Sequence, residues 1–137
     1  MVINIIELNK GLKRRFDENK VIRYRKTDFV EYLEWGRGKD DPTHKIYYLC
    51  LIPLGKLYVS GDYGNATYAV DYNKDLEFWN STGTQYFTSK CVCYDTRMNI
   101  EKRSEIHRYG LRKCMEQKFD PDRSSDEEFM ETYYNPF

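Results

Sequence analysis

The sequence predicts an α+β fold: one domain in which a three- to four-stranded antiparallel meander carries an N-terminal helix and C-terminal helices packed on it. Apolar residues recur with a period near two between residues 21 and 71 and with helical spacing on either side. At 137 residues the chain is long enough to bury one hydrophobic core. We therefore divide it into an amphipathic helix (1–19), a sheet (20–72) and a helical part with an acidic tail (73–137).

The first segment has the pattern of a helix that packs on a core. Its apolar and basic residues fall on opposite sides when placed at helical spacing. Gly11 weakens this helix without forbidding it. The apolar side consists of Ile5, Leu8, Leu12 and Phe16, and the basic side of Lys10, Lys13 and Arg14.

The sheet is predicted from alternation and turn residues. Residues 21–25 alternate Ile22 and Tyr24 with basic residues, and residues 56–62 place Leu57 and Val59 opposite Tyr58 and Ser60. Residues 28–35 fit a helix or a strand, and the loop-like GRGKDDP that follows favours a strand. Residues 45–53 form an apolar run ending at a proline, and residues 66–72 complete the meander.

Helices are predicted after residue 73. Asn73 is the expected N-cap of a helix at 74–80, and Thr84 of one that continues to Cys93. Asp95 or Thr96 should begin a longer helix that stops before Pro121, with an apolar line of Ile100, Ile106, Tyr109, Leu111 and Met115. Ser125 to Glu128 form a capping box for a last short helix.

The net charge is zero, but the charge is unevenly placed. Residues 10–26 hold eight Lys or Arg against two acids, and residues 120–137 hold six acids against one Arg. The two segments either pair with each other or meet a charged partner. Neutrality overall argues against general nucleic-acid binding by the whole chain. The thirteen tyrosines exceed what a core needs and favour a binding surface.

The stretch GDYGN (61–65) is a candidate phosphate loop or a hairpin bend. A phosphate loop leads into a helix, whereas strand-like sequence follows here, and Gly and Asn tolerate the positive φ of a bend. We therefore predict a hairpin. An aromatic residue at its tip, Tyr63 beside Asp62 and Asn65, is then an expected contact point for a partner.

No catalytic group is predicted, and the chain is expected not to be an enzyme. Cys114 lies seven residues from His107, but a buried structural cysteine on a helix is the commoner arrangement. Cys50, Cys91, Cys93 and Cys114 lack zinc-ligand spacing, so no metal and no cofactor are expected. No apolar run approaches ~20 residues. The N-terminal charge order is the reverse of a secretory signal, which predicts an intracellular protein with reduced thiols.

The motifs at 32–38, 57–70 and 86–93 together resemble small proteins encoded by bacteriophages and prophages. In that group a strand leads into a Gly-Asp-Tyr-Gly-x-Ala-x-Tyr hairpin, and a Tyr-Phe-x-x-Lys-Cys helix follows. The resemblance covers about residues 22–93, and Val70 departs from it where a tryptophan is expected. Some of these proteins are similar to anti-CRISPR inhibitors, which implies a viral protein acting in the cytoplasm of a host bacterium.

The resemblance implies a partner: a CRISPR effector nuclease, with type II favoured, either alone or with its guide RNA. Such nucleases expose basic grooves for DNA, and an acidic, tyrosine-bearing surface can occupy them by DNA mimicry. Neither a membrane nor a small-molecule substrate is implied, and dimerisation stays open. Besides the hairpin tip, the expected contact residues are Asp120, Asp122, Asp126, Glu127, Glu128 and Glu131, with Tyr133 and Tyr134 as anchors.

Two alternatives remain. One is a nucleic-acid-binding phage accessory protein that uses the basic helix at 102–118, with support from residues 13–26. The other is a phage structural protein, for which self-association would be the indication. The cations of the basic helix are Lys102, Arg103, Arg108, Arg112 and Lys113.

Overall fold

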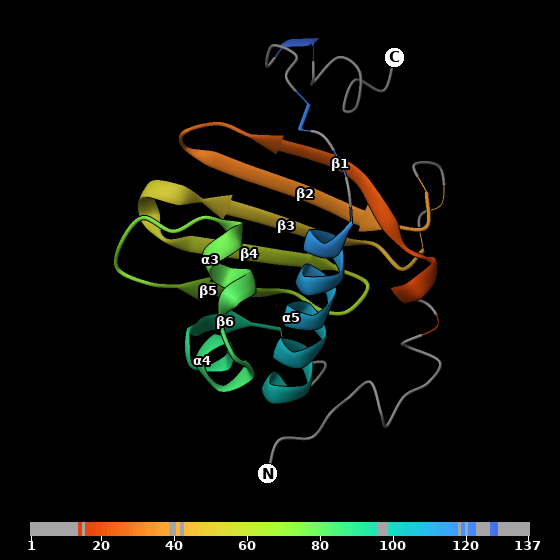
Figure 1. Ribbon diagram of the computed structural model, residues 1–137. Coiled ribbons are helices and arrows are strands. Elements are labelled where there is room, and N and C mark those ends of the chain that lie inside the picture. Colours follow the sequence, from red (N-terminus) through yellow and green to blue (C-terminus); the bar gives the residue numbers. More distant parts are fainter. Residues whose placement is uncertain are drawn as a thin grey trace.

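A six-stranded antiparallel sheet forms the centre of the computed structural model, with strand order β1-β2-β3-β4-β5-β6. The structure describes residues 14, 16–38, 41, 43–95, 99–117, 119, 121–122 and 127–128. The α+β class is confirmed, whereas the sheet is larger than the three to four strands expected. Figure 1 shows helices α3, α4 and α5 together on one face of this sheet.

Each strand pairs with the next one along the chain, so the sheet is a simple meander. The ambiguous segment at 28–35 contributes β2, a strand as predicted. Residues 91–93 were expected to be helical, and this prediction is wrong: they belong to β6, which pairs with β5. The strands are β1 (Lys20–Lys26), β2 (Val30–Gly36), β3 (Ile46–Leu51), β4 (Lys56–Gly61), β5 (Ala66–Ala69) and β6 (Cys91–Tyr94).

Short turns fix the register of the strands. Between β1 and β2 the Thr27 hydroxyl accepts hydrogen bonds from the amides of Phe29 and Val30, at 3.2 and 3.1 Å. Between β3 and β4 a 3-10 turn, η1 (Ile52–Leu54), carries Pro53 and ends at Gly55, whose φ of 63° suits glycine.

The helices begin at caps other than those predicted. Asp75, not Asn73, caps α3 (Leu76–Ser81), because its carboxylate accepts from the Phe78 amide. Helix α4 (Thr84–Ser89) has Gly83 at the N-cap. Helix α5 (Ile100–Glu116) is capped by Asn99, whose side chain accepts from the amides of Glu101 and Lys102. None of the described helices is long and apolar enough to cross a membrane.

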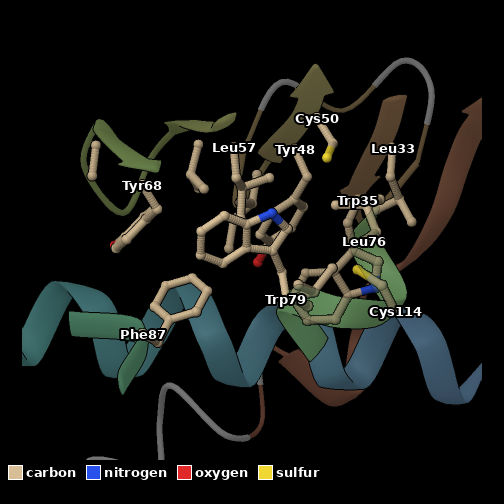
Figure 2. Packing of buried hydrophobic residues seen from close by; sticks show 14 of the residues in the cluster. Leu33, Trp35, Tyr48, Cys50, Leu57, Tyr68, Leu76, Trp79, Phe87 and Cys114 are labelled. Carbon is tan, nitrogen blue, oxygen red and sulfur yellow. The ribbon is translucent and has the colours of Figure 1, made fainter. Parts of the chain in front are cut away.

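The core lies between the sheet and the three helices. Trp79 of α3 and Phe87 of α4 meet Tyr68 of β5, with Tyr48 and Leu57 of the sheet beside them in Figure 2. The Tyr68 and Phe87 ring centroids lie 4.2 Å apart. This packing covers the face of the sheet that carries every second residue of β2 to β5.

The N-terminal helix predicted at 1–19 lies almost entirely outside the described residues. Of its apolar line only Phe16 is described; it is helical and buried, and its ring contacts Trp35 and Tyr109. The last helix is likewise described only at Glu127 and Glu128, both helical.

Candidate partner-binding surfaces

The stretch 61–65 is a hairpin bend, as its sequence predicts. Gly61 and Gly64 have φ values of 126° and 93°, which disfavour residues with a side chain. The amide of Asp62 donates to the carbonyl of Lys45 at 3.0 Å, so the bend is tied to the start of β3. A Cβ on Gly61 would lie 2.1 Å from that same carbonyl oxygen.

Tyr63 does not project from the bend, so the prediction that its ring is exposed at the tip is wrong. The side chain is buried, with 8% of its surface exposed. Its ring packs edge-on against Phe16 at 5.3 Å, and its hydroxyl lies 3.1 Å from Nδ1 of His44. Asp62 and Asn65 on either side are exposed, as expected. The tip therefore offers polar groups to a partner and keeps its ring in the core.

The described start of the acidic tail is attached to the outer edge of the sheet. The Asp122 amide donates to the carbonyl of Tyr24 on β1 at 2.7 Å, and the Phe119 and Tyr24 rings meet at 4.8 Å. Asp122 is half-buried, while Glu127 and Glu128 are exposed. The other expected contact residues of this tail lie outside the described residues: Asp120, Asp126, Glu131, Tyr133 and Tyr134.

The basic helix is less basic at its surface than its sequence suggests. Arg103 was predicted on the polar face, but its side chain is fully buried. The Arg108 guanidinium donates to the Thr82 carbonyl at 2.8 Å. Lys113 lies 3.6 Å from a carboxylate oxygen of Asp17. Lys102 and Arg112 are exposed but share the helix surface with exposed Glu101 and Glu116. The accessible face is therefore of mixed charge.

Arg103 is a structural residue that joins α5 to the hairpin. Its guanidinium donates to the Asp95 carboxylate at 2.9 Å and to the Asp95 carbonyl at 2.6 Å. The other carboxylate oxygen of Asp95 accepts from the Asn65 amide at 2.8 Å. Gly64 lies directly over Arg103, because a Cβ there would be 2.7 Å from Nε. Paired in this way, a buried cation is tolerated in the core.

His107 and Cys114, the two candidates for nucleophilic chemistry, both face the core. Burial lowers the pKa of His107 to about 4, so the ring is neutral. Its Nε2 donates to the Gly64 carbonyl at 3.1 Å, and its Nδ1 accepts from the Tyr68 hydroxyl at 2.8 Å. Burial also raises the pKa of the Cys114 thiol well above its ordinary value, which disfavours the thiolate. Both residues have structural roles in this arrangement.

The face of the sheet opposite the helices was not singled out from the sequence as a site. It carries a row of residues paired across neighbouring strands, and no described helix lies on it. Tyr47 lies in a neighbouring row, where it is paired with Glu34 on β2 and with Ser60 on β4. Tyr32, Tyr47 and Tyr58 on this face are all half-buried. The first row is Arg25, Tyr32, Leu49, Tyr58 and Thr67.

Glu34 lies on this face, and two cations contact its carboxylate. The Arg23 guanidinium and the Lys45 ammonium each lie 3.2 Å from one of its carboxylate oxygens. Lys20 and Arg25 on β1 and Lys56 on β4 add three further positive charges to the same face. Among the described strand residues of this face, cations outnumber acids.

Within the described part of the chain, no cluster of three or more His, Cys, Asp or Glu side chains could hold a metal ion. Comparison with known proteins gives no family model, no curated protein and no solved structure that matches this chain. A proposal about function therefore depends on the residues themselves and on the resemblance of their motifs.

Proposed function

We propose that the protein is a stoichiometric inhibitor of an RNA-guided CRISPR nuclease, which it binds so as to block DNA binding or cleavage. The observation that carries the proposal is the attachment of the acidic tail to the outer edge of β1, through the Asp122 amide and the Phe119 ring. The phage-protein motifs of the hairpin and of helix α4 support it.

The attachment matters because it gives the acidic segment a defined starting point. A tail without such a contact would lose conformational entropy on binding, whereas a segment already held at the sheet edge loses less. Glu127 and Glu128 are exposed beyond this point. Their charges are suited to the arginines with which such nucleases read the PAM duplex. Asp62 and Asn65 at the hairpin tip are further candidate contacts.

The mixed charge of α5 makes nucleic-acid binding by that helix the weaker candidate. Counterion release scales with the number of cations that reach phosphates. Burial of Arg103 removes one of the five predicted cations, and Arg108 and Lys113 already have partners within the fold. Lys102 and Arg112 alone would support only a weak electrostatic contact.

The first test is a pull-down of the tagged chain from a lysate of CRISPR-bearing bacteria, with mass spectrometry of the bound proteins and an assay for RNA. Recovery of one effector nuclease in stoichiometric amount is expected. Recovery of mixed nucleic acid, or of this protein alone, would contradict the proposal.

A charge-reversal pair then tests the surface in a cleavage assay with the recovered nuclease. The variant Glu127→Lys/Glu128→Lys should raise the half-inhibitory concentration by about tenfold or more, because like charges meet in the groove. The control Asp71→Lys/Glu116→Lys reverses two exposed acids elsewhere and should change it by less than about threefold. Equal effects of the two variants would show that the tail has no special part in binding.

A further inference from the structure

Three exposed apolar side chains gather at one end of the sheet. Phe29 lies in the turn between β1 and β2, Leu54 ends η1 between β3 and β4, and Tyr72 follows β5. Figure 1 shows these three connections at the same end of the sheet. Two hydrogen bonds join them: the Ile52 amide donates to the Phe29 carbonyl at 2.9 Å, and the Lys74 amide to the Ile52 carbonyl at 3.3 Å. The three side chains therefore belong to one surface, which we call the end patch.

The end patch is large for the surface of a single chain. The exposed fractions are 68% for Phe29, 59% for Leu54 and 56% for Tyr72. At about 200 Å² for each fully exposed residue, the three together expose roughly 350 Å². Apolar patches of this size on a folded monomer often mark an interaction site. An open hollow of about 420 Å³ lies among the same three connections, with Ile52 and Phe78 as its apolar lining.

The hollow carries equal numbers of positive and negative side chains. Lys26 and Lys74 are the cations, and Asp28 and Asp75 are the acids. Lys26 and Asp75 pair with each other at 3.1 Å. The Lys74 ammonium lies 4.8 Å from the centroid of the Phe78 ring, and Asp28 is exposed. Within the described part of the chain neither Lys74 nor Asp28 has an ion-pair partner, so each can meet an opposite charge on another molecule.

We infer that the end patch is a dimer interface, on which a second copy of this chain packs around a two-fold axis. Such an interface requires a surface that is complementary to itself. The end patch meets this requirement, because its apolar side chains can pack on their own copies while Lys74 of each chain meets Asp28 of the other. The inference does not depend on the proposed nuclease partner, since the acidic tail and the hairpin tip take no part in it.

The balance of charge disfavours the other partners of an exposed apolar patch. Nucleic acid and an anionic membrane both attract surfaces with an excess of cations, whereas the hollow has as many acids as cations. An unrelated protein needs only a surface complementary to its own, with no balance of signs. A second copy is the partner for which a balanced patch is expected.

The test measures the mass of the full chain in solution by sedimentation equilibrium. Reductant is present, because the exposed Cys93 thiols would otherwise form a disulfide between copies. Interfaces of this small size are usually weak, so a dissociation constant of about 10–100 μM is expected. A chain that stays monomeric up to about 500 μM would overturn the inference. Growth beyond two chains would also overturn it, because a two-fold interface closes.

A matched pair of variants locates the interface. Phe29→Ser removes the most exposed side chain of the end patch and should weaken dimerisation about tenfold or more. Val92→Ser is the control, because Val92 is 65% exposed but lies on β6, outside the end patch. It should change the dissociation constant by less than about twofold. An equal or larger effect of Val92→Ser would contradict the inference.

A charge exchange tests the two-fold arrangement. Asp28→Lys and Lys74→Glu each place like charges opposite one another, so each variant alone should be monomeric where the wild type dimerises. An equimolar mixture should recover a dimer with one copy of each variant, because both contacts then join opposite charges. Native mass spectrometry identifies this mixed dimer, and its recovery shows that both variants are folded. A mixture that stays monomeric would contradict the contact between Lys74 and Asp28.

Two further results would assign the end patch to another occupant and overturn the inference. One is a monomeric chain that sediments with phosphatidylserine vesicles and loses this binding in Phe29→Ser. The other is a monomeric chain whose Phe29→Ser variant fails to recover one unrelated protein in the pull-down. Neither result affects the proposed nuclease binding, which is tested separately with Glu127→Lys/Glu128→Lys.

Discussion

The hydroxyl of Tyr68 lies 2.8 Å from Nδ1 of His107, so strand β5 and helix α5 are joined by a hydrogen bond inside the core. The second ring nitrogen of His107 binds the Gly64 carbonyl at 3.1 Å. One imidazole therefore ties β5, the β4–β5 bend and α5 together.

His107 should make stability depend on pH between about 6.5 and 4. Burial lowers its pKa from 6.5 to about 4, so in this range the unfolded chain takes up a proton that the folded chain does not. The contribution of His107 to the free energy of unfolding is complete above pH 6.5. It decreases as pH falls, by roughly 3 kcal/mol in total. Urea unfolding of the wild type and of His107→Gln should show a stability difference that shrinks on acidification. A difference that stays constant from pH 7 to 4.5 would contradict this assignment.

Gly110 should resist substitution although it lies inside a helix. Alanine there would normally favour the helix by about 1 kcal/mol. The Cβ of that alanine, however, would lie 2.5 Å from the Tyr48 hydroxyl, which donates to the His107 carbonyl at 2.7 Å. We expect Gly110→Ala to lower the free energy of unfolding by about 1–3 kcal/mol.

The cause of that loss can be isolated with a double-mutant cycle. Tyr48→Phe removes the oxygen that the new methyl group would meet, at a cost of about 0.5–1.5 kcal/mol for the lost hydrogen bond. In the Tyr48→Phe background Gly110→Ala should therefore cost at least about 1 kcal/mol less than in the wild type. Strict additivity of the two substitutions would show that the hydroxyl is not the obstacle.

Gly64 should be intolerant of a side chain for two reasons. Its φ of 93° is a conformation that other residues rarely adopt, and a Cβ would meet the buried Arg103 guanidinium. Gly64→Ala should lower stability by about 1–3 kcal/mol. Gly38→Ala is the matched control, since no atom lies within 4 Å of a Cβ there. It should change stability by less than about 0.5 kcal/mol in thermal or urea unfolding.

The four cysteines should fall into two classes of reactivity. Cys93 is exposed and Cys91 half-buried, while Cys50 and Cys114 are buried. Burial also raises the pKa of the Cys50 thiol to about 12, which leaves almost no thiolate at neutral pH. In a time course with a maleimide, followed by mass spectrometry, Cys93 should react first and Cys91 more slowly. Labelling of Cys50 or Cys114 without denaturant would contradict their burial in the core.

Local patterns predicted the meander because its strands are consecutive and their turns are short. The strand at 30–36 and the bend at 61–65 could be identified from alternation, glycine and asparagine alone. Strand β6 could not be identified in this way, because no turn residue separates Cys91–Tyr94 from α4. This segment is a strand because it pairs with the edge of β5. The burial of Tyr63 likewise depends on Phe16 and His44, which are distant from it in the sequence. The burial of Arg103 depends on its pairing with Asp95, which the sequence pattern did not indicate.

The row formed by Tyr32, Leu49 and Tyr58 is a part of the fold that the sequence alone could not predict. The alternation of Leu57 and Val59 with Tyr58 and Ser60 predicted which residues of β4 share a face, and the excess of tyrosine favoured a binding surface. The register of β2, β3 and β4 is needed to place Tyr32, Leu49 and Tyr58 side by side. Register depends on turn geometry and on the buried side of each strand, so it emerged only with the structure.

The consecutive strand order has a consequence for how the chain is made on the ribosome. Each hairpin can form as soon as its second strand is synthesised, because no strand waits for a distant partner. Helix α5, which packs on the sheet and supplies seven buried residues from positions 103–114, is synthesised after all six strands. Until then the nascent chain exposes the apolar side of a nearly complete sheet. A premature stop codon before residue 103 would therefore yield an aggregation-prone fragment and no smaller working version of the protein.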